Sequence, residues 1–580
     1  MSFFNIATIN ESWQSFERLV CRLLIYEGFT GVRLVGQTND KGADIIAHKA
    51  NQRWLIQVKH WKVPIGIDVI EQTLNAMKYY QANIPVVISK NGFLKNALAH
   101  RNILLQNRIP IQLWSAADLI RRAESIPDSY PFGDPQKVFE KRDYQENAIQ
   151  LLFHELEYNK ASKALIVMAT GLGKTHVLFE FIRRLRQLDK QRVLIIAHTN
   201  ALVHQLEKNL WAYLKSSEET LVWNGYEPQT RMALSRANSV VACVNTIASY
   251  ISNGADLPNF DIIAIDECHH VGNEGMYNSV IDNLRAGQEG GPKLIGVTAT
   301  PWRADETDLQ RIFGKPLLSI DMVSGLRKGF LANIDYRMYT DNIDWSKIRS
   351  LHGDRLSPRG INRTLFISNW DDAVVIELKK IWQEQTNPRA IVFCGIIDHA
   401  IMMRDRINAL GFCRAEAIYS KLTNGKAMES SERNKILCDF HDGKTQVVCA
   451  VDIFNEGIDV PDVNIVVFQR VTHSRRIFIQ QLGRGLRISK GKTKVIVLDF
   501  VSDIRRFAAG LSLKDSLTVN NRNKKGNPIW INIDHKVRFC KAGGDDNHTE
   551  TFLREWLDDV AAIEEANEDT TILKFPPAFL

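Results

Sequence analysis

The feature that most constrains the fold is a glycine-rich turn that directly follows a short apolar run. Residues 165–168 are Leu-Ile-Val-Met, and residues 169–175 are Ala-Thr-Gly-Leu-Gly-Lys-Thr. This order predicts a buried strand that leads into the N-terminus of a helix, where backbone N–H groups can bind phosphate. The strict phosphate-loop pattern has a glycine at the position of Met168, so the turn alone is an incomplete match.

The side chains of this turn predict a nucleotide site. Thr170, Gly171 and Gly173 would surround the phosphates of ATP. Lys174 would contact the β- and γ-phosphates, and the Thr175 hydroxyl would bind Mg²⁺. The turn therefore predicts ATP and Mg²⁺ as cofactors.

Two acids follow a second apolar run. Residues 262–265 are Ile-Ile-Ala-Ile, and Asp266 and Glu267 come next. Parallel sheets bind ligands at the carboxyl ends of their strands. We therefore expect Asp266 to bind Mg²⁺ and Glu267 to activate the attacking water. An isolated Asp-Glu pair after a strand is more often a solvated loop, so this prediction depends on the other motifs.

Two further segments complete an ordered set. Residues 298–301 are Thr-Ala-Thr-Pro, and residues 481–487 are Gln-Leu-Gly-Arg-Gly-Leu-Arg. Taken in this order, the four segments resemble those of superfamily 2 helicases of the DEAD/DEAH type. Within that group the chain is similar to the motor subunits of type I and type III restriction enzymes and to related repair helicases, over about residues 135–505. The resemblance implies an ATP-driven motor that acts on nucleic acid.

The resemblance also implies roles for residues outside these two sites. Gln145 resembles the glutamine that reads adenine. Thr298 and Thr300 are expected to couple hydrolysis to strand movement. Gly457 and Asp459 are expected to contact both ATP and the strand, and Arg484 and Arg487 are expected to act as arginine fingers. An arginine finger is worth on the order of 10³ to 10⁵ in rate. Hydrolysis would then require the two motor lobes to close.

A second group of polar residues lies near the N-terminus. Glu17 falls in a segment whose apolar spacing predicts a helix. Asp44 and Gln57 lie thirteen positions apart in two apolar, strand-like runs, and Lys59 follows two positions later. A hairpin could place Asp44, Gln57 and Lys59 around one Mg²⁺ ion, since carboxylate and amide oxygens suit that ion and the ammonium can orient or acidify the attacking water.

Read alone, this pattern more often marks a polar pair at a strand edge. Residues 10 to about 120, however, resemble the Mrr-type restriction endonuclease domain. In that family a helical Glu precedes an Asp and then Gln-x-Lys, matched here by Glu17, Asp44, Gln57 and Lys59. The resemblance implies a DNA endonuclease with these four as catalytic residues, and with Asp44 and Gln57 as metal ligands.

Composition agrees with a large soluble protein of the cytoplasm. The chain has 580 residues, a formal net charge of +7 and 45% hydrophobic residues. A basic balance suits DNA as a partner, because neutralised phosphates release counterions. A run of eighteen apolar residues is absent, so no membrane partner is expected. The eight cysteines contain no Cys-x-x-Cys pair, which argues against zinc and disulfides and for a reducing compartment.

Proline-rich segments and the spacing of apolar runs predict the domain organisation. Three prolines in residues 125–135 indicate a linker. Strands are expected at 163–170, 191–198, 239–244, 260–266 and 293–300, and again at 389–394, 445–451, 463–469 and 493–500. We predict an α/β chain made of the following parts: a nuclease domain (1–124), a linker (125–138), a first RecA-like lobe (139–325), an inter-lobe segment (326–385), a second RecA-like lobe (386–505) and a C-terminal region with an acidic tail (506–580).

The sequence therefore predicts an ATP-dependent DNA helicase or translocase fused to a Mg²⁺-dependent endonuclease, acting in restriction or antiphage defence. One alternative is a genome-maintenance enzyme that processes DNA ends or forks. Another is a motor whose N-terminal domain binds DNA without cutting it. No target-recognition segment is evident, so the discrimination of self from foreign DNA is expected to come from a protein partner or from DNA structure.

Overall fold

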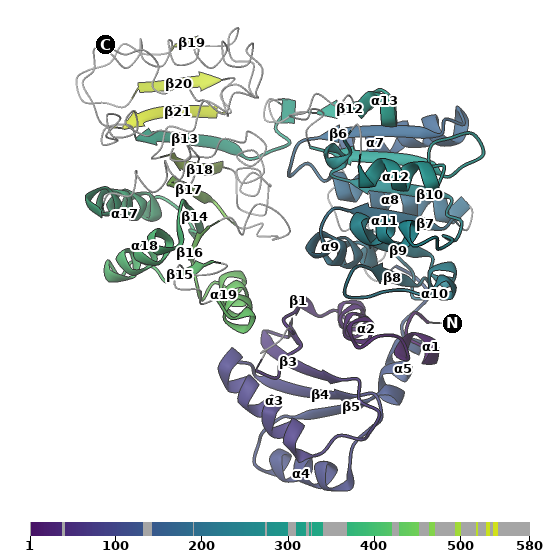
Figure 1. Ribbon diagram of the computed structural model, residues 1–580. Coiled ribbons are helices and arrows are strands. Elements are labelled where there is room, and N and C mark those ends of the chain that lie inside the picture. The colour runs from purple at the N-terminus through teal and green to yellow at the C-terminus, as the bar shows by residue number, and fades with distance from the viewer. Residues whose placement is uncertain are drawn as a thin grey trace. The chain divides into compact units, whose positions relative to one another are not determined.

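The computed structural model describes the chain in segments (Figure 1): residues 2–36, 41–130, 142–188, 191–272, 275–299, 309–320, 324–325, 328–339, 368–419, 428–451, 463–469, 494–499, 518–519, 529–533 and 537–542. These residues fall into two compact units. The first comprises Met1–Val167, Gly173–Leu318 and Glu429–Cys438, and the second comprises Met168–Leu172, Ser319–Met428 and Asp439–Leu580. Three sheets carry the fold.

The N-terminal sheet has the order β1-β2-β3-β4-β5. Strands β1 to β3 pair antiparallel, and β3 to β5 pair parallel. Its strands are β1 (Thr30–Leu34), β2 (Ile45–Lys49), β3 (Gln52–Lys59), β4 (Ile84–Ser89) and β5 (Gln112–Ser115). The helices of this domain are α1 (Ile6–Ile9), α2 (Trp13–Tyr26), α3 (Ile67–Tyr80), α4 (Lys95–Gln106) and α5 (Ala116–Glu124).

Local chemistry explains the two elements that position the N-terminal polar residues. Helix α2 begins where the Ser12 side chain accepts a hydrogen bond from the backbone N–H of Ser15, which satisfies one of the free amides of the first turn. Most of α2 is buried, and the helix packs on β1, β2 and α5. Strands β2 and β3 form the expected hairpin, in which Ile45 lies opposite Ile56.

The first motor sheet has the order β12-β6-β11-β10-β7-β9-β8, and its strands β6 to β11 pair in parallel. Its strands are β6 (Lys163–Met168), β7 (Val193–Ala197), β8 (Thr220–Trp223), β9 (Ser239–Cys243), β10 (Ile262–Asp266), β11 (Lys293–Thr298) and β12 (Pro316–Ile320). Its helices are α7 (Asp143–Phe153), which continues as a π-helical turn (His154–Tyr158), α8 (Lys174–Leu188), α9 (Asn200–Leu210), α10 (Arg231–Arg236), α11 (Val244–Ser252), α12 (Met276–Asn283) and α13 (Leu309–Phe313). Short 3₁₀ turns follow α9 (Trp211–Tyr213) and β10 (Cys268–His270).

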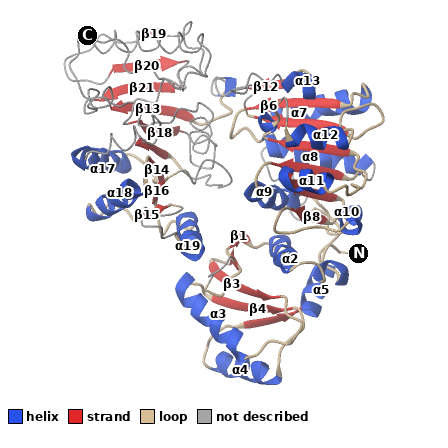
Figure 2. Cartoon of the chain, in the orientation of Figure 1, coloured by secondary structure: helices blue, strands red, loops and turns tan. Residues whose placement is uncertain are grey.

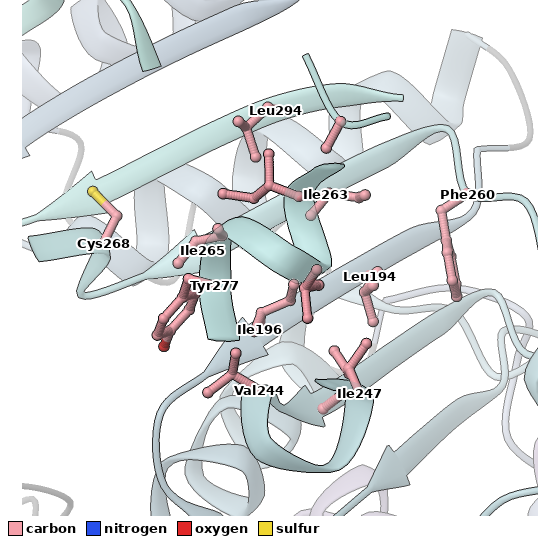
Figure 3. Packing of buried hydrophobic residues seen from close by; sticks show 14 of the residues in the cluster. Leu194, Ile196, Val244, Ile247, Phe260, Ile263, Ile265, Cys268, Tyr277 and Leu294 are labelled. Atoms are coloured by element: carbon pink, nitrogen blue, oxygen red, sulfur yellow. The ribbon is translucent and has the colours of Figure 1, made fainter. Parts of the chain in front are cut away.

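One face of this sheet packs on α11 and α12 (Figure 3). Ile196, Ile263 and Ile265 project from the central strands, and they meet Ile247 of α11 and Tyr277 of α12 in one buried cluster. Removing this much branched apolar surface from water is the main force that holds the lobe together. The central strands are therefore rigid supports for the loops at their carboxyl ends.

The second motor sheet has the order β15-β16-β14-β17-β18-β13-β21-β20-β19 (Figure 2). Its strands are β13 (Asn333–Tyr339), β14 (Ala390–Cys394), β15 (Ala415–Ile418), β16 (Val447–Ala450), β17 (Ile465–Gln469), β18 (Lys494–Asp499), β19 (Thr518–Val519), β20 (Ile529–Ile533) and β21 (Val537–Ala542). The neighbouring helices are α17 (Ser368–Gln383), α18 (Ile397–Ala409) and α19 (Ser430–His441).

The predicted α/β class with two parallel motor sheets is confirmed, and each expected strand is found within two residues of its predicted start. Sequence reasoning missed β8, β12 and β15. It also placed β13 in a separate inter-lobe segment, whereas β13 pairs with β18 inside the second sheet. Likewise β21 pairs with β13, so part of the C-terminal region extends the same sheet. None of the described helices is long and apolar enough to cross a membrane.

Within the first unit, the N-terminal domain packs closely on the first motor lobe. Arg18 of α2 is buried between two acids of that lobe, with Nε 2.8 Å from Glu207 Oε2 and Nη1 2.6 Å from Glu227 Oε1. The side chains of all three are at most 5% exposed. One turn later, the buried Arg22 donates to two backbone carbonyls of the lobe at 2.8 and 2.9 Å. Charged groups as deeply buried as these must be paired, so this contact is a specific one.

The start of the predicted linker also contacts the first lobe. Asp128 Oδ1 accepts a hydrogen bond from the backbone N–H of Ser217 at 3.0 Å. The Arg183 guanidinium lies 5.0 Å from the centre of the Tyr130 ring. Residues 125–130 therefore follow the surface of the lobe, and the rest of the predicted linker lies outside the described residues.

Candidate ATPase and nuclease sites

The glycine-rich turn joins β6 to α8 as predicted. Gly171 and Gly173 both have φ near +90°, a conformation that side chains disfavour. A Cβ atom on Gly173 would collide with the amide of Gln145. Gln145 therefore lies directly against the turn, where a glutamine that contacts a bound nucleotide would be expected.

Asp266 ends β10, and Glu267 precedes the 3₁₀ turn Cys268–His270. Glu267 has φ 49° and ψ 50°, a left-handed conformation that is rare for a non-glycine residue. Such strain is often found at functional sites. Glu267 Oε1 lies 3.3 Å from Lys174 Nζ. The structure thus brings together the lysine of the turn and the two acids, which lie over ninety residues apart in the sequence.

The electrostatics of the acid pair follow from burial and from Lys174. Burial and the neighbouring Glu267 carboxylate raise the pKa of Asp266 to about 7. Burial opposes ionisation of Glu267 too, but Lys174 and His269 outweigh it and hold the pKa of Glu267 below its usual range. A cation beside Asp266 would favour its ionised form.

The acids fit a divalent cation. Asp266 Oδ1 is buried and makes no hydrogen bond to any of the described residues. Burying a carboxylate oxygen without a partner costs free energy unless a cation or a hydrogen-bond donor contacts it. Thr175 lies in the first turn of α8, beside Lys174. Oxygen donors of this kind suit Mg²⁺, which retains several of its waters.

Sequence reasoning missed His269 as a link between the acids and β11. Its Nδ1 lies 2.9 Å from Thr298 Oγ1 and 3.3 Å from Glu267 Oε2. Thr298 is fully buried at the end of β11. His269 therefore connects the predicted coupling residue to the predicted water-activating one. The sequence feature that could have indicated this link is the position of His269, two residues after Glu267.

Five predicted motor residues lie outside the described residues: Thr300, Gly457, Asp459, Arg484 and Arg487. Their roles remain predictions from the resemblance.

The N-terminal hairpin brings Asp44 close to the Gln57 to Lys59 segment. The backbone N–H of Asp44 donates to the carbonyl of Ile56 at 3.0 Å. Asp44 Oδ2 accepts a hydrogen bond from the backbone N–H of Val58 at 2.6 Å. The carboxylate of Asp44, itself 5% exposed, is thus fixed beside the strand that carries Gln57 and Lys59.

The amide of Gln57 is fully buried and tightly held. One of its two polar atoms lies 3.0 Å from Lys59 Nζ and 2.8 Å from Gln72 Oε1, and the other contacts Thr73 Oγ1. Because an ammonium can only donate, the atom that faces Lys59 is best assigned as the amide oxygen, and the Gln72 amide is then turned so that its nitrogen donates to the same oxygen. Gln72 and Thr73, both on α3, were not predicted, and no motif in the sequence marks them.

Glu17 is buried in α2 with 7% exposure. The described residues contain no group of three or more His, Cys, Asp or Glu side chains arranged to hold a metal ion. The candidate nuclease site instead offers Asp44 and the Gln57 amide. Such a sparse oxygen set would suit a hard cation that keeps its own waters, such as Mg²⁺, and it does not suit zinc.

Comparisons with known proteins match the parts of the chain that contain these two sites. Residues 9–123 match the family model described as restriction endonuclease, of the Mrr catalytic type. Residues 138–303 match the model described as type III restriction enzyme, res subunit. Residues 373–489 match the helicase conserved C-terminal domain.

Relatives and solved structures extend the likeness. The chain is 25% identical over 544 residues to the type I restriction enzyme EcoAI endonuclease subunit of Escherichia coli, covering 87% of this chain and 65% of the relative. It is 25% identical over 410 residues to the DNA 3'-5' translocase XPB2 of Sulfurisphaera tokodaii, covering 64% of this chain and 84% of the relative.

One solved structure covers nearly the whole chain. The fold is similar to an ATP-dependent type ISP restriction-modification enzyme, LlaBIII, bound to DNA, with a TM-score of 0.50 and 16% identity over 98% of this chain and 43% of that one. The chain thus spans less than two thirds of the Escherichia coli relative and less than half of LlaBIII. By these matches, the chain carries a segment similar to Mrr-type restriction endonuclease domains, followed by segments similar to the type III restriction enzyme res subunit and to the helicase conserved C-terminal domain.

Proposed function

We propose that the protein is an ATP-dependent DNA helicase or translocase that carries its own Mg²⁺-dependent DNA endonuclease and acts in defence against foreign DNA. The observation that carries this proposal is the presence, in one chain, of two separate sites. Lys174 faces Glu267 in the motor, and Asp44 is fixed beside Gln57 and Lys59 in the N-terminal domain.

In the motor, the turn at Gly171 and Gly173 binds the phosphates of ATP, and Lys174 neutralises their charge. Glu267 is ionised and positioned by His269, so it can accept a proton from water. Bound Mg²⁺, held by Thr175 and Asp266, would neutralise charge on the phosphates.

In the nuclease domain, Lys59 orients water toward the scissile phosphate, and Asp44 and Gln57 would hold a Mg²⁺ ion. A Mg²⁺ ion there would stabilise negative charge on that phosphate. Glu17 would complete the site from α2. These roles follow the Mrr-type likeness together with the hairpin geometry.

Several assignments rest on resemblance alone. Arg484 and Arg487 act as arginine fingers, Gly457 and Asp459 contact nucleotide and strand, and a partner protein supplies DNA specificity. The Escherichia coli relative is a subunit of its enzyme, which supports the proposal of a partner.

The motor is tested by DNA-stimulated ATP hydrolysis. Lys174→Ala and Glu267→Gln should each lower the rate to the background without DNA, since one removes phosphate neutralisation and the other the base. Lys160→Ala, an exposed lysine of the same lobe, should hydrolyse ATP at the wild-type rate. Substantial hydrolysis by either site variant would refute the motor assignment.

Control of cutting by the motor is tested with the Lys174→Ala protein. Its cleavage of duplex DNA is measured with Mg²⁺ and ATP at an enzyme concentration that saturates binding. Loss of cutting would support gating by hydrolysis. Cutting at the wild-type rate would show that the motor only delivers the nuclease.

A further inference from the structure

An exposed tryptophan follows the candidate nuclease lysine. Trp61 is 44% exposed and Val63 is 61% exposed, and both follow β3, which is largely buried. Single apolar side chains are often exposed, so exposure alone assigns no role to Trp61, and its position must carry the argument. The ring lies close to the candidate site, since Lys59 Nζ is 5.8 Å from its centre.

The segment that carries Trp61 is held in a defined shape. It runs beside the loop after β4, where the backbone N–H of Lys90 donates to the carbonyl of Lys59 at 3.0 Å. Farther on, the N–H of Ile65 donates to the carbonyl of Gly92 at 3.0 Å. The Asn91 side chain donates to the carbonyl of Trp61 itself. The two loops therefore form one surface at the end of β3 and β4.

The charge of this surface has one sign. Residues 59–66 are Lys-His-Trp-Lys-Val-Pro-Ile-Gly, and residues 90–97 are Lys-Asn-Gly-Phe-Leu-Lys-Asn-Ala. Together they contain four lysines and no acid. Lysine is depleted at protein–protein interfaces, whereas basic grooves with interspersed aromatic rings bind single-stranded nucleic acid. The charge thus favours a DNA strand over a protein as the occupant.

We propose that Trp61 stacks on an unpaired base next to the scissile phosphate, so that the nuclease prefers single-stranded or unwound DNA. This deepens the proposed endonuclease function and rests on it. A base inside a duplex is already stacked on its neighbours and offers no free face to Trp61. An unpaired base gains the stacking energy, and the three lysines other than Lys59 contact phosphates on either side. The strand separated by the motor is such a substrate.

Cleavage kinetics test the preference in the full chain. Trp61→Ala should lower kcat/KM on a single-stranded oligonucleotide by about 5- to 150-fold, which corresponds to the 1–3 kcal/mol of one base stack. On a blunt duplex of the same sequence the change should be less than about twofold, since no stack is lost there. Trp61→Phe should recover most of the loss. Trp13→Ala, which removes a 52% exposed tryptophan of the same domain, is the matched control and should leave both rates unchanged.

Equal losses on both substrates would overturn the proposal, because they indicate a structural role. An unchanged rate on single-stranded DNA would overturn it as well. So would a change from oligomer to monomer on Trp61→Ala, measured by sedimentation, since the surface would then bind a second copy of the chain.

A second readout does not depend on cleavage. An oligonucleotide that contains 5-bromouracil is cross-linked to the wild-type protein by light in EDTA, and the attached peptide is identified by mass spectrometry. The expected peptide contains Trp61. If the wild-type protein cross-links there but cuts no DNA, the endonuclease function fails and the binding surface stands. If the wild-type protein cuts DNA but cross-links elsewhere, the endonuclease function stands and the proposed binding surface at Trp61 fails.

Discussion

Replacing Arg18 should loosen the N-terminal domain from the motor. Arg18 is the cation of a buried triad with Glu207 and Glu227, at 2.8 and 2.6 Å. Arg18→Ala would leave two carboxylates buried without a counter-charge. Breaking a buried pair in this way costs about 3–5 kcal/mol. Arg121→Ala is the control, because the Arg121 side chain is 74% exposed and its pair with Asp118 should be worth less than about 1 kcal/mol.

The loss should depend on pH. Burial raises the pKa of Glu207 in the native protein, and Arg18 opposes that rise. Without Arg18 the pKa of Glu207 in the folded protein rises further. At a pH between the pKa of Glu207 in the unfolded chain and its pKa in the folded protein, the folded variant therefore binds more protons than its unfolded chain. Its stability is then lost as pH rises through this window. The deficit should be smallest near the unfolded pKa of about 4.3 and largest above neutrality.

The assay is urea unfolding of the full chain, followed by proteolysis of the separated domain. The wild-type N-terminal domain and first lobe should unfold together. Arg18→Ala should shift this transition by the stated 3–5 kcal/mol and expose residues 125–130 to protease. The triple variant Arg18→Met, Glu207→Gln, Glu227→Gln should recover most of the loss, since no buried charge remains. If Arg18→Ala behaves like Arg121→Ala at every pH, the interface is not the one described.

Two further predictions concern the candidate sites. Gly173→Ala should lower ATP affinity at least tenfold, measured with a fluorescent nucleotide, because the added Cβ would meet Gln145. The control is Gly254→Ala, which should bind ATP normally because Gly254 also has a positive φ but has open space around it. Equal binding by the two variants would refute the packing of Gln145 on the turn. Gln57→Glu should lower the Mg²⁺ concentration needed for half-maximal cleavage, because a carboxylate binds Mg²⁺ more strongly than an amide and Lys59 can balance the added charge; an unchanged Mg²⁺ requirement would exclude Gln57 as a ligand.

Much of the fold could be predicted because its information is local. The hairpin that joins Asp44 to Gln57 was visible as two apolar runs with room for a turn between them, and β6 and β10 were visible as apolar runs that end in polar motifs. Periodicity and turn residues suffice for such elements.

Other features depend on contacts between distant segments. Strand β13 joins the second sheet through β18, which lies more than 150 residues later, so no local pattern identifies it. Arg18 is a charged residue in a helix, a type that is almost always exposed, and only Glu207 and Glu227 explain its burial. Thr73 was missed because α3 meets Gln57 only in the folded domain.

The central claim is that one chain contains two independent active sites. The most direct measurement is the paired rate of ATP hydrolysis and DNA cleavage by the Asp44→Ala protein, with Glu124→Ala, an exposed acid of the same domain, as the control. We expect Asp44→Ala to hydrolyse ATP at the wild-type, DNA-stimulated rate and to cut no DNA, whereas Glu124→Ala should do both. Wild-type cleavage by Asp44→Ala would contradict a nuclease site at Asp44 and would leave the N-terminal domain as a DNA-binding module.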